Sequence, residues 1–426
     1  MTDILDELTW RESVAQTTDV GALRTALAEG PVTAYCGFDP TAPSLHFGNF
    51  VQLVVLRRLQ RAGHRVICLV GGSTGLIGDP RPTSERVLKT KEQTADNVAR
   101  IKALVRPFLD FDGTDPACAH PAVLVDNLDW TAPMSALDFL RDVGKHFRVN
   151  QMIRKEAIAA RLESQEGISY TEFSYQLLQA LDYLHLYRAM GCTLQTGGSD
   201  QWGNLTAGVD LVHRVEGAAV HALTTPLLTD ASGQKFGKSE GNAVWLSADM
   251  TSPYAFYQYF LNVEDASVVR LLKVFTDRTR EEVAELERAV VEEPWRRLAQ
   301  RTLAADVTTL VHGEAATDAA RAASEALFGR GDLRALDGPT LRDAAHELPR
   351  GEVSVGMPLV DALVAVGLAE SRNAARRTIG EGGASVNGEK VADPERVLTE
   401  TDVLAGGVVV LRRGRKNLAA GLVATS

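Results

Sequence analysis

The sequence predicts an α/β protein whose first half forms a parallel β-sheet covered by helices, followed by an α-helical domain and a small α+β domain. Two observations support this prediction. In the first half, apolar strand-like runs alternate with helical segments, which is typical of βαβ units. Strand signals then fade beyond residue 252 and return only near the C-terminus.

Short apolar runs predict the strands of the sheet. Residues 50–62, which are rich in Leu, Val and Arg, are predicted to form the helix that follows the first strand. Ligands of such Rossmann-like sheets bind beyond the carboxyl ends of the strands, so we expect the functional site there. The predicted strands are residues 32–38, 65–70 and 122–126, and a fourth that starts at residues 192–195.

The rest of the chain is predicted to be helical and then mixed. Thr279 and Glu282 have the spacing of a helix-capping box, and helical composition continues to residue 328. The next residues mix Gly, Pro and charged side chains, which indicates a linker with one short helical piece. The expected domains are residues 1–250, 251–328 and 357–426, with a linker at 329–356.

Composition indicates a globular protein that is not basic throughout. The 426 residues carry 45 basic and 55 acidic side chains, a net charge of 45 − 55 = −10, and 45% are hydrophobic. This excludes a protein that wraps nucleic acid by bulk positive charge. In residues 352–426, however, nine Lys and Arg balance nine Asp and Glu, so the C-terminal region is neutral.

Cysteine usage and the N-terminus predict the compartment. The four cysteines are widely spaced and form no C-x-x-C pair, which favours a reducing compartment. The N-terminal residues lack an apolar signal-peptide core, and the chain has no run of ~18 apolar residues. We therefore expect a cytoplasmic protein that is not bound to a membrane.

Two short motifs are candidates for phosphate binding. His46 and Gly48 lie where the first helix is predicted to begin, and a helix N-terminus attracts phosphate while glycine permits close approach. Lys235 and Lys238 flank a Phe-Gly pair in a glycine-rich loop, where two ammonium groups could clamp a polyphosphate. Each motif alone has an ordinary alternative, a capping histidine in the first case and solvated loop lysines in the second.

A third candidate is a set of polar residues in an apolar helix. Tyr175, Gln179 and Asp182 are spaced by four and three residues, so they share one face of a predicted helix. Neighbours such as Phe173 and Leu177 are apolar, which indicates burial on several sides. Buried polar groups need partners that a ligand can provide, although a polar surface face is the ordinary alternative.

The motifs resemble those of class I aminoacyl-tRNA synthetases. HFGN at 46–49 resembles their HIGH signature, and KFGKS at 235–239 resembles their KMSKS loop. Similarity to the bacterial tyrosyl-tRNA synthetases extends from about Glu12 to the C-terminus and includes YCGFDPTAPSLHFGN, LVGGSTGLIGDP, GISYTEFSYQLLQALDYLHLY and LQTGGSDQWGN. The resemblance implies activation of L-tyrosine by ATP to tyrosyl-adenylate and pyrophosphate, and then transfer of tyrosine to the 3′ end of tRNA(Tyr).

The resemblance also implies the residues of the site. Tyr35 and Asp182 would bind the substrate phenol, and ATP is a substrate rather than a tightly bound cofactor. The residues implied for tyrosine are Tyr35, Asp79, Tyr175, Gln179, Asp182 and Gln201. Those implied for ATP are Asp39, His46, Gly48, Gly198, Asp200, Lys235, Lys238 and Ser239. Those implied for catalysis are Thr41, His46, Asn49, Lys235 and Lys238, with Arg86 and Mg²⁺ on the departing pyrophosphate.

Three features depart from the family pattern. Asn49 replaces the second histidine of the HIGH signature and cannot carry charge. The loop after Asp79 offers only Arg81 and Arg86 as cations, and the lysine loop has Phe-Gly in place of Met-Ser. These departures bear on the roles of individual residues more than on the reaction.

The C-terminal region contains clustered basic residues. On their own they are typical of a solvated face, but GMPLVDALVAVGLAESRNAARRTIGEGGASVNGEKV resembles a small RNA-binding module that also occurs in a ribosomal small-subunit protein. The resemblance implies tRNA binding here, and a homodimer in which each tRNA touches both subunits. We expect truncation after Arg350 to keep tyrosine activation and abolish tRNA charging. The residues expected to contact tRNA are Arg372, Arg376, Arg377, Arg412 and Arg413.

Three alternative functions were weighed. Tyr35 and Asp182 argue against the tryptophan-specific relative of the family. His46, Asp200 and Lys238 argue against a non-catalytic RNA-binding descendant of a synthetase. A nucleotidyltransferase of the His-x-Gly-His type shares the first motif but lacks the RNA-binding C-terminal region.

Overall fold

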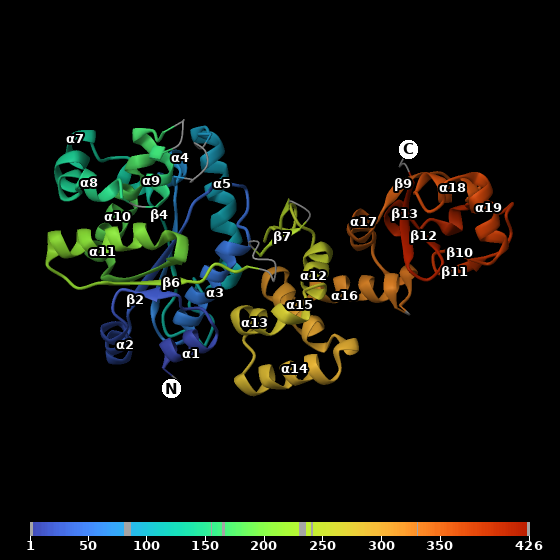
Figure 1. Cartoon of the computed structure of the whole chain (residues 1–426), viewed down its shortest axis with the longest axis horizontal. Coiled ribbons are helices and arrows are strands. Elements are labelled where there is room, and N and C mark those ends of the chain that lie inside the picture. Colours follow the sequence, from blue (N-terminus) through green and yellow to red (C-terminus); the bar gives the residue numbers. More distant parts are fainter. Residues whose placement is uncertain are drawn as a thin grey trace. The chain divides into compact units, whose positions relative to one another are not determined.

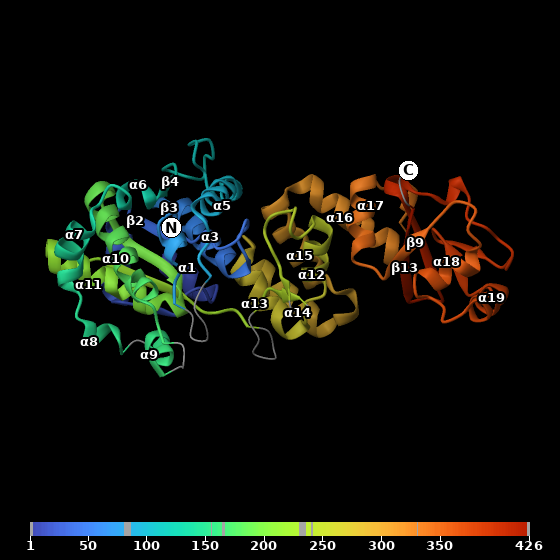
Figure 2. The ribbon, with the colours of Figure 1, turned by 90° about the horizontal axis from the view of Figure 1, so that it is seen from above.

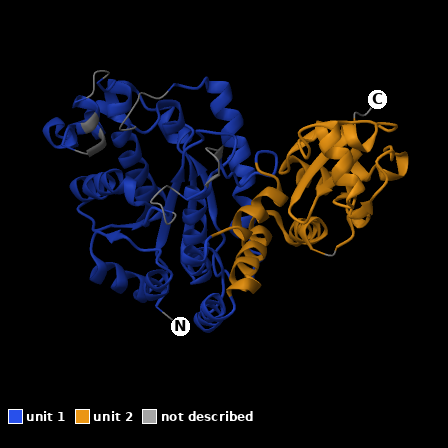
Figure 3. Ribbon diagram, turned by 45° about the vertical axis from the view of Figure 1, so that its right-hand side comes forward, with its two compact units in different colours: residues 1–250, 264–293 blue, residues 251–263, 294–426 orange. Residues whose placement is uncertain are grey.

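The computed structural model describes residues 3–80, 87–154, 156–163, 167–229, 236–239, 242–329 and 331–423. The chain forms two compact units (Figure 3). Unit 1 contains residues 1–250 and 264–293, and unit 2 contains residues 251–263 and 294–426. None of the helices in the described ranges combines the length and the apolar character that a membrane span requires.

A six-stranded sheet lies at the centre of unit 1, with the strand order β1-β6-β5-β2-β3-β4 (Figure 1). β1 is antiparallel to β6, and all other neighbours are parallel. The chain leaves β2 toward β3 and β4, and later leaves β5 toward β6, so β2 and β5 form the switch point where such sheets bind ligands. The strands are β1 (Gln16–Thr17), β2 (Thr33–Phe38), β3 (Arg65–Val70), β4 (Val123–Asp126), β5 (Cys192–Gly198) and β6 (His221–Thr225).

Helices pack on this sheet and carry the residues of the site (Figures 1 and 2). The longest, α10, buries residues such as Tyr183 and Leu186 against β5 and α11, because its apolar side chains surround most of the helix. The helices of unit 1 are α1 (Ile4–Trp10), α2 (Val20–Glu29), α3 (Phe47–Arg61), α4 (Thr74–Ile77), α5 (Lys91–Leu104), α6 (Leu128–Thr131), α7 (Ala136–Asp138), α8 (Val149–Met152), α9 (Glu156–Glu163), α10 (Tyr170–Met190), α11 (Trp202–Glu216), α13 (Asp265–Phe275) and α14 (Arg280–Glu292).

The structure confirms the predicted fold class and most predicted elements. The four predicted strands correspond to β2, β3, β4 and β5, and the predicted capping box is present, with the Thr279 side chain accepting from the backbone of Glu282. The sequence analysis did not predict β6, because HALTT contains too few apolar residues to stand out. Both faces of β6 are nevertheless buried, since it lies inside the sheet.

Unit 2 joins a group of helices to a second sheet. Its five strands have the order β11-β10-β12-β13-β9, with β9 parallel to β13 and all other neighbours antiparallel. The strands are β9 (Arg350–Val353), β10 (Ala384–Val386), β11 (Glu389–Val391), β12 (Val408–Arg413) and β13 (Asn417–Val423). The helices are α12 (Pro253–Leu261), α15 (Leu298–His312), α16 (Glu314–Phe328), α17 (Gly338–His346), α18 (Leu359–Ala365) and α19 (Arg372–Gly380).

The contact units differ from the expected domain division in two places. Residues 329–356, expected to form a linker, contain α17 and β9, and β9 hydrogen-bonds to β13 as an edge strand of the sheet. The expected helical domain is divided, since α13 and α14 belong to unit 1 and α12, α15 and α16 belong to unit 2. The division into catalytic, helical and RNA-binding domains stays a prediction.

Candidate active site

The junction between β2 and α3 holds the first part of the site. His46 caps α3: its Nδ1 accepts from the Gly48 backbone N–H at 3.1 Å, and Asn49 Oδ1 accepts from the His46 backbone N–H at 3.2 Å. With Nδ1 as the acceptor, the neutral ring carries its proton on Nε2 and can donate it to an oxygen. His46, Gly48 and Thr41 are all exposed at this edge. The capping role and a phosphate-binding role are therefore compatible.

The described part of the lysine loop packs against the same helix start. The Phe236 ring lies 5.2 Å from the Phe47 ring, and Trp245 pairs with His46 through an isolated β-bridge. Gly237 has φ +94°, and a Cβ built on it would lie 2.5 Å from the Phe47 Cβ. Lys238 follows directly as the first residue of β7, so its backbone is held close to the start of α3.

Other cations of the predicted site belong to segments without a described structure. Lys235, Arg81 and Arg86 lie outside the described residues. Ser239 is the second residue of β7 (Lys238–Ser239), which pairs with β8 (Asn242–Ala243) to form a hairpin.

Asp39, at the carboxyl end of β2, accepts hydrogen bonds from two other side chains of the site. It accepts from the Tyr175 hydroxyl at 2.7 Å and from Thr74 Oγ1 at 2.6 Å. A Cβ at Gly71 would lie 2.2 Å from Asp39 Oδ1, so this close approach requires glycine. Burial, and then the charge of Asp39, raise the pKa of Tyr175 well above its ordinary value. The resemblance implies that Tyr175, Gln179 and Asp79 hold the substrate ammonium, and the structure adds a hydrogen bond from the Tyr175 hydroxyl to Asp39.

Asp182 of α10 is buried and held by two donors. Its oxygens accept from Asn127 Nδ2 at 3.0 Å and from Trp130 Nε1 at 2.9 Å. Burial raises the pKa of Asp182 to about 7, although these two hydrogen bonds oppose the shift. Asn127 Nδ2 also donates to Thr74 Oγ1 at 3.1 Å, which links Asp182 to the network around Asp39.

Two buried polar atoms near these groups have no hydrogen-bond partner among the described residues. They are the Tyr35 hydroxyl and Gln179 Oε1. Tyr35 is 1% exposed and lies in one buried cluster with Leu181 and Tyr183, the two neighbours of Asp182 in α10. Burial first, and then the charge of Asp182, raise the pKa of Tyr35 well above its ordinary value. Because buried polar atoms are normally paired, these two mark a place where a polar ligand fits.

The carboxyl end of β5 supplies the last part. Gln201 Nε2 donates to Asp79 Oδ2 at 2.8 Å, and Asn204 joins both residues. Asp200 is exposed in the turn Ser199–Gln201, and a Cβ at Gly198 would lie 2.6 Å from Asp200 Oδ1. The sequence also allows Ser199 or Asp200 simply to cap the helix that follows, but neither this turn nor α11 has a side-chain cap.

The sequence analysis missed four residues of this network, which are Thr74, Asn127, Trp130 and Asn204. They come from segments after β3, β4 and β5, and each has a partner in another segment. Thr74 and Asn204 lie in segments that resemble the family, but those long-range partners do not show in the sequence. The available signal was their position, since polar residues just beyond parallel strands meet at one edge of the sheet.

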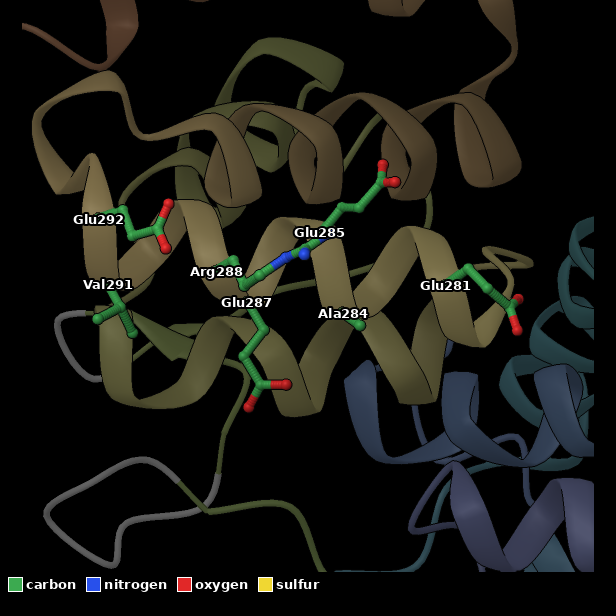
Figure 4. Close-up of a pocket in the computed structure, with 7 residues that line it drawn as sticks. All are labelled: Glu281, Ala284, Glu285, Glu287, Arg288, Val291 and Glu292. Atoms are coloured by element: carbon green, nitrogen blue, oxygen red, sulfur yellow. The ribbon is translucent and has the colours of Figure 1, made fainter.

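A hollow of about 670 Å³ lies elsewhere, along one exposed side of α14 (Figure 4). It contains none of the predicted site residues, and all of its lining comes from a single helix, so it has no convergent polar groups from different elements. The lining residues are Glu281, Ala284, Glu285, Glu287, Arg288, Val291 and Glu292.

Comparisons with known proteins identify the family. The family described as tRNA synthetases class I (W and Y) matches residues 27–329, and the Tyrosine–tRNA ligase SYY-like C-terminal domain matches residues 340–420. Tyrosine–tRNA ligase from Streptomyces coelicolor is 59% identical over 99% of both chains, and that from Streptomyces griseus is 60% identical over 99% of this chain and 98% of its own.

Solved structures agree with this assignment. A C-terminally truncated mitochondrial tyrosyl-tRNA synthetase from Aspergillus nidulans matches with a TM-score of 0.68 and 30% identity, over 75% of this chain and 92% of its own. A similar truncated enzyme from Coccidioides posadasii matches with a TM-score of 0.66 and 31% identity, over 75% and 91%. The chain belongs to the class I tRNA synthetases of the tryptophan and tyrosine group.

Proposed function

We propose that this chain is a tyrosine–tRNA ligase, which activates L-tyrosine with ATP and transfers it to tRNA(Tyr). The observation that carries this proposal is the buried Tyr35 hydroxyl, which has no partner among the described residues, together with the buried Asp182 carboxylate. A phenol bound there would donate its proton to the Asp182 carboxylate and give the Tyr35 hydroxyl a partner. Phenylalanine would leave both groups without that partner, which costs binding free energy.

The α-ammonium group of the bound tyrosine would lie beside hydrogen-bond acceptors. Gln179 Oε1 and the Asp79 carboxylate suit the α-ammonium group, which only donates hydrogen bonds. Tyr175 gives its proton to Asp39, so its oxygen is left to accept from the same ammonium. Gln201 would donate to the substrate carboxylate.

Activation would need positioning and charge stabilisation rather than a general base. The tyrosine carboxylate is already a nucleophile for the α-phosphate of ATP. His46 and Thr41, exposed at the start of α3, would donate to the phosphate oxygens, and Lys238 with Lys235 would stabilise the pyrophosphate. Arg86 would assist, and Mg²⁺ would arrive with the phosphates of ATP.

ATP binding would use two aspartates at the carboxyl ends of β2 and β5, of which Asp39 is half-buried and Asp200 is exposed. Asp39 directly follows β2 and Asp200 follows β5, and these two strands are neighbours in the sheet. A carboxylate has about four acceptor positions, so Asp39 can still accept from a ribose hydroxyl while it holds Tyr175. Gly198 and Gly48 would let the nucleotide approach the backbone closely.

Binding of tRNA would involve the basic face of α19. Arg372 pairs with Asp361 at 2.8 Å and Arg376 with Glu395 at 3.0 Å, while Arg377 is exposed beside them. Exposed ion pairs contribute little to stability, so RNA phosphates can replace the carboxylate partners.

The arginines of β12 are placed differently. Arg413 donates to the Leu368 carbonyl at 2.8 Å, and Arg412 donates to the Leu327 carbonyl. Carbonyls do not neutralise a guanidinium, so both side chains keep their charge for tRNA.

We also propose that the chain forms a homodimer and acts in the cytoplasm. Between β4 and α10 several large apolar side chains are exposed, including Leu137 at 79%, Leu140 at 50% and Val149 at 62%. Exposed apolar groups of this kind mark protein interfaces, and a second copy of the chain is the partner we propose.

Aminoacylation tests the proposed function. Purified enzyme, ATP and bacterial tRNA are incubated with radiolabelled tyrosine, and in parallel with tryptophan or phenylalanine. We expect label on tRNA with tyrosine only. Charging with tryptophan instead would assign the chain to the other specificity of its family.

A further inference from the structure

We propose that Asn204 is a positioning residue, which fixes the Gln201 amide so that it offers an N–H to the carboxylate of the amino-acid substrate. The inference rests on the proposed function, because it takes tyrosine as the ligand. Asn204 lies in the first turn of α11, three residues after Gln201. Both side chains converge on Asp79, which comes from the segment after α4.

Three hydrogen bonds determine which way the Gln201 amide faces. Asn204 Nδ2 donates to Gln201 Oε1 at 3.0 Å and to Asp79 Oδ1 at 3.1 Å. Gln201 Nε2 donates to Asp79 Oδ2 at 2.8 Å. If the Gln201 amide turned over, its oxygen would face the Asp79 carboxylate and its nitrogen would face the Asn204 donor. Both contacts would then be repulsive.

The fixed orientation has a chemical consequence. The Gln201 amide nitrogen carries two hydrogens, and these three bonds use only one of them. The second can donate to an anion. Asp79 supplies the negative charge for an ammonium group at the same place, so the triangle matches the two charged groups of an α-amino acid. Asn204 touches neither group of the substrate and acts through Gln201.

A purely structural role for Asn204 makes a different prediction. Asn204 is the third residue of α11, where an acidic side chain interacts favourably with the helix dipole. If Asn204 only stabilised the helix start, Asn204→Asp would be harmless. If it orients Gln201, the same change replaces the donor to Gln201 Oε1 by a carboxylate, so the observed orientation of the amide is no longer favoured over the turned one.

Three ligands separate the two roles. The tyrosine KM is measured by pyrophosphate exchange, together with inhibition constants for tyramine, which lacks the carboxylate, and for 3-(4-hydroxyphenyl)propanoate, which lacks the ammonium. For Asn204→Asp we expect the values for tyrosine and the propanoate to rise roughly tenfold or more, because a charged hydrogen bond is lost. Tyramine should not lose affinity, since it does not use the Gln201 N–H and the added carboxylate lies beside the group that we propose binds its ammonium.

Two further variants serve as controls. Asn204→Ala removes the donor without adding charge, and we expect the same selectivity with a smaller effect. Thr206→Ser, on the same helix, keeps its hydroxyl bond to the Trp202 carbonyl and should leave all three constants unchanged.

The outcomes are distinguishable. An equal loss for all three ligands, or no change for any of them, would overturn the positioning role. Wild-type enzyme without tyrosine-dependent exchange would instead refute the proposed function.

Discussion

At the scale of single residues, Asp182 combines burial with a task that requires charge. Its pKa is raised from 3.8 to about 7, because burial penalises the carboxylate. Between these two values the folded protein binds more protons than the unfolded chain, so the carboxylate lowers stability as the pH rises toward 7. The two donors, Asn127 and Trp130, make ionisation feasible.

This gives a pH dependence for substrate binding. Asp182 must be ionised to accept the phenolic proton, so the tyrosine KM should fall as the pH rises through about 7 and then level off. Pyrophosphate exchange between about pH 6 and pH 8 measures it, with the ATP KM as the control that should not share this transition. A tyrosine KM that stays flat over this range would contradict the role of Asp182.

Tyr35→Phe tests the other half of the phenol site. The Tyr35 hydroxyl is buried without a partner among the described residues, so its removal should leave stability unchanged or raise it by up to about 1 kcal/mol in urea unfolding. The tyrosine KM should rise roughly fivefold, because the substrate loses a hydrogen bond.

Tyr183→Phe is the matched control for this change. Tyr183 is equally buried and stacks edge-on against Tyr35, but its hydroxyl donates to the His221 carbonyl at 2.7 Å. This variant should lose about 1 kcal/mol of stability and keep its tyrosine KM. The reverse pattern in the two variants would show that Tyr35 is only a core residue.

Individual site residues could be predicted only where they lie in segments that resemble the family. Tyr35, His46 and Tyr175 lie in such segments and could be named from the sequence alone. Asn127 lies outside them, and its partners Thr74 and Asp182 come from other parts of the chain. Asn204 lies in such a segment, but its bond to Asp79, which comes from another segment, could not be seen in the sequence. Hydrogen bonds across the sheet edge become visible only when the strands are assembled.

At the scale of elements, the lysine loop depends on its contact with α3. Gly237 adopts a left-handed conformation against Phe47, and a side chain there would collide with that ring. Gly237→Ala should therefore displace Lys238 and lower the kcat of pyrophosphate exchange by roughly tenfold or more, which corresponds to the cost of the strained backbone. The tyrosine KM should not change, because the tyrosine pocket lies on other elements.

A control for this prediction is Gly217→Ala. Gly217 also has a positive φ, but open space surrounds it at the end of α11. It should lose some stability and keep its kcat. Equal kcat in the two variants would show that the loop does not need its contact with Phe47.

Elements were predictable in proportion to their apolar content. β2, β3 and β4 are apolar runs, and their positions were found to within a few residues. β5 (CTLQTGG) is less apolar, and only its start was predicted. β6 was missed because its threonines are polar in sequence yet buried in the sheet, where Thr225 Oγ1 accepts from Gln52 at 2.7 Å. Residues 350–353 were expected to belong to a linker because β13, with which β9 pairs, lies far along the chain.

At the scale of the whole molecule, the proposed chemistry and RNA binding fall into different units. All proposed tyrosine and ATP residues belong to unit 1, and the basic α19 belongs to unit 2. The net charge of −10 is therefore an average over regions with different partners. The neutral C-terminal region carries the arginines proposed to meet tRNA.

Truncation separates the two activities. Because Arg350 begins β9, which pairs only with β13, the better cut is after Glu347, which keeps α17 and removes the sheet. The truncated protein should keep tyrosine-dependent pyrophosphate exchange and lose tRNA charging, since phosphate contacts dominate RNA affinity. Full charging by this protein would contradict the proposed role of the C-terminal sheet and α19.

Pyrophosphate exchange dependent on tyrosine tests the central claim most directly. Full-length protein is incubated with ATP, Mg²⁺ and labelled pyrophosphate, together with tyrosine, phenylalanine or tryptophan. The structure predicts that label enters ATP with tyrosine and not with the other two, because only a phenol pairs with both Tyr35 and Asp182. Exchange that is absent with tyrosine, or equally fast with phenylalanine, would contradict it.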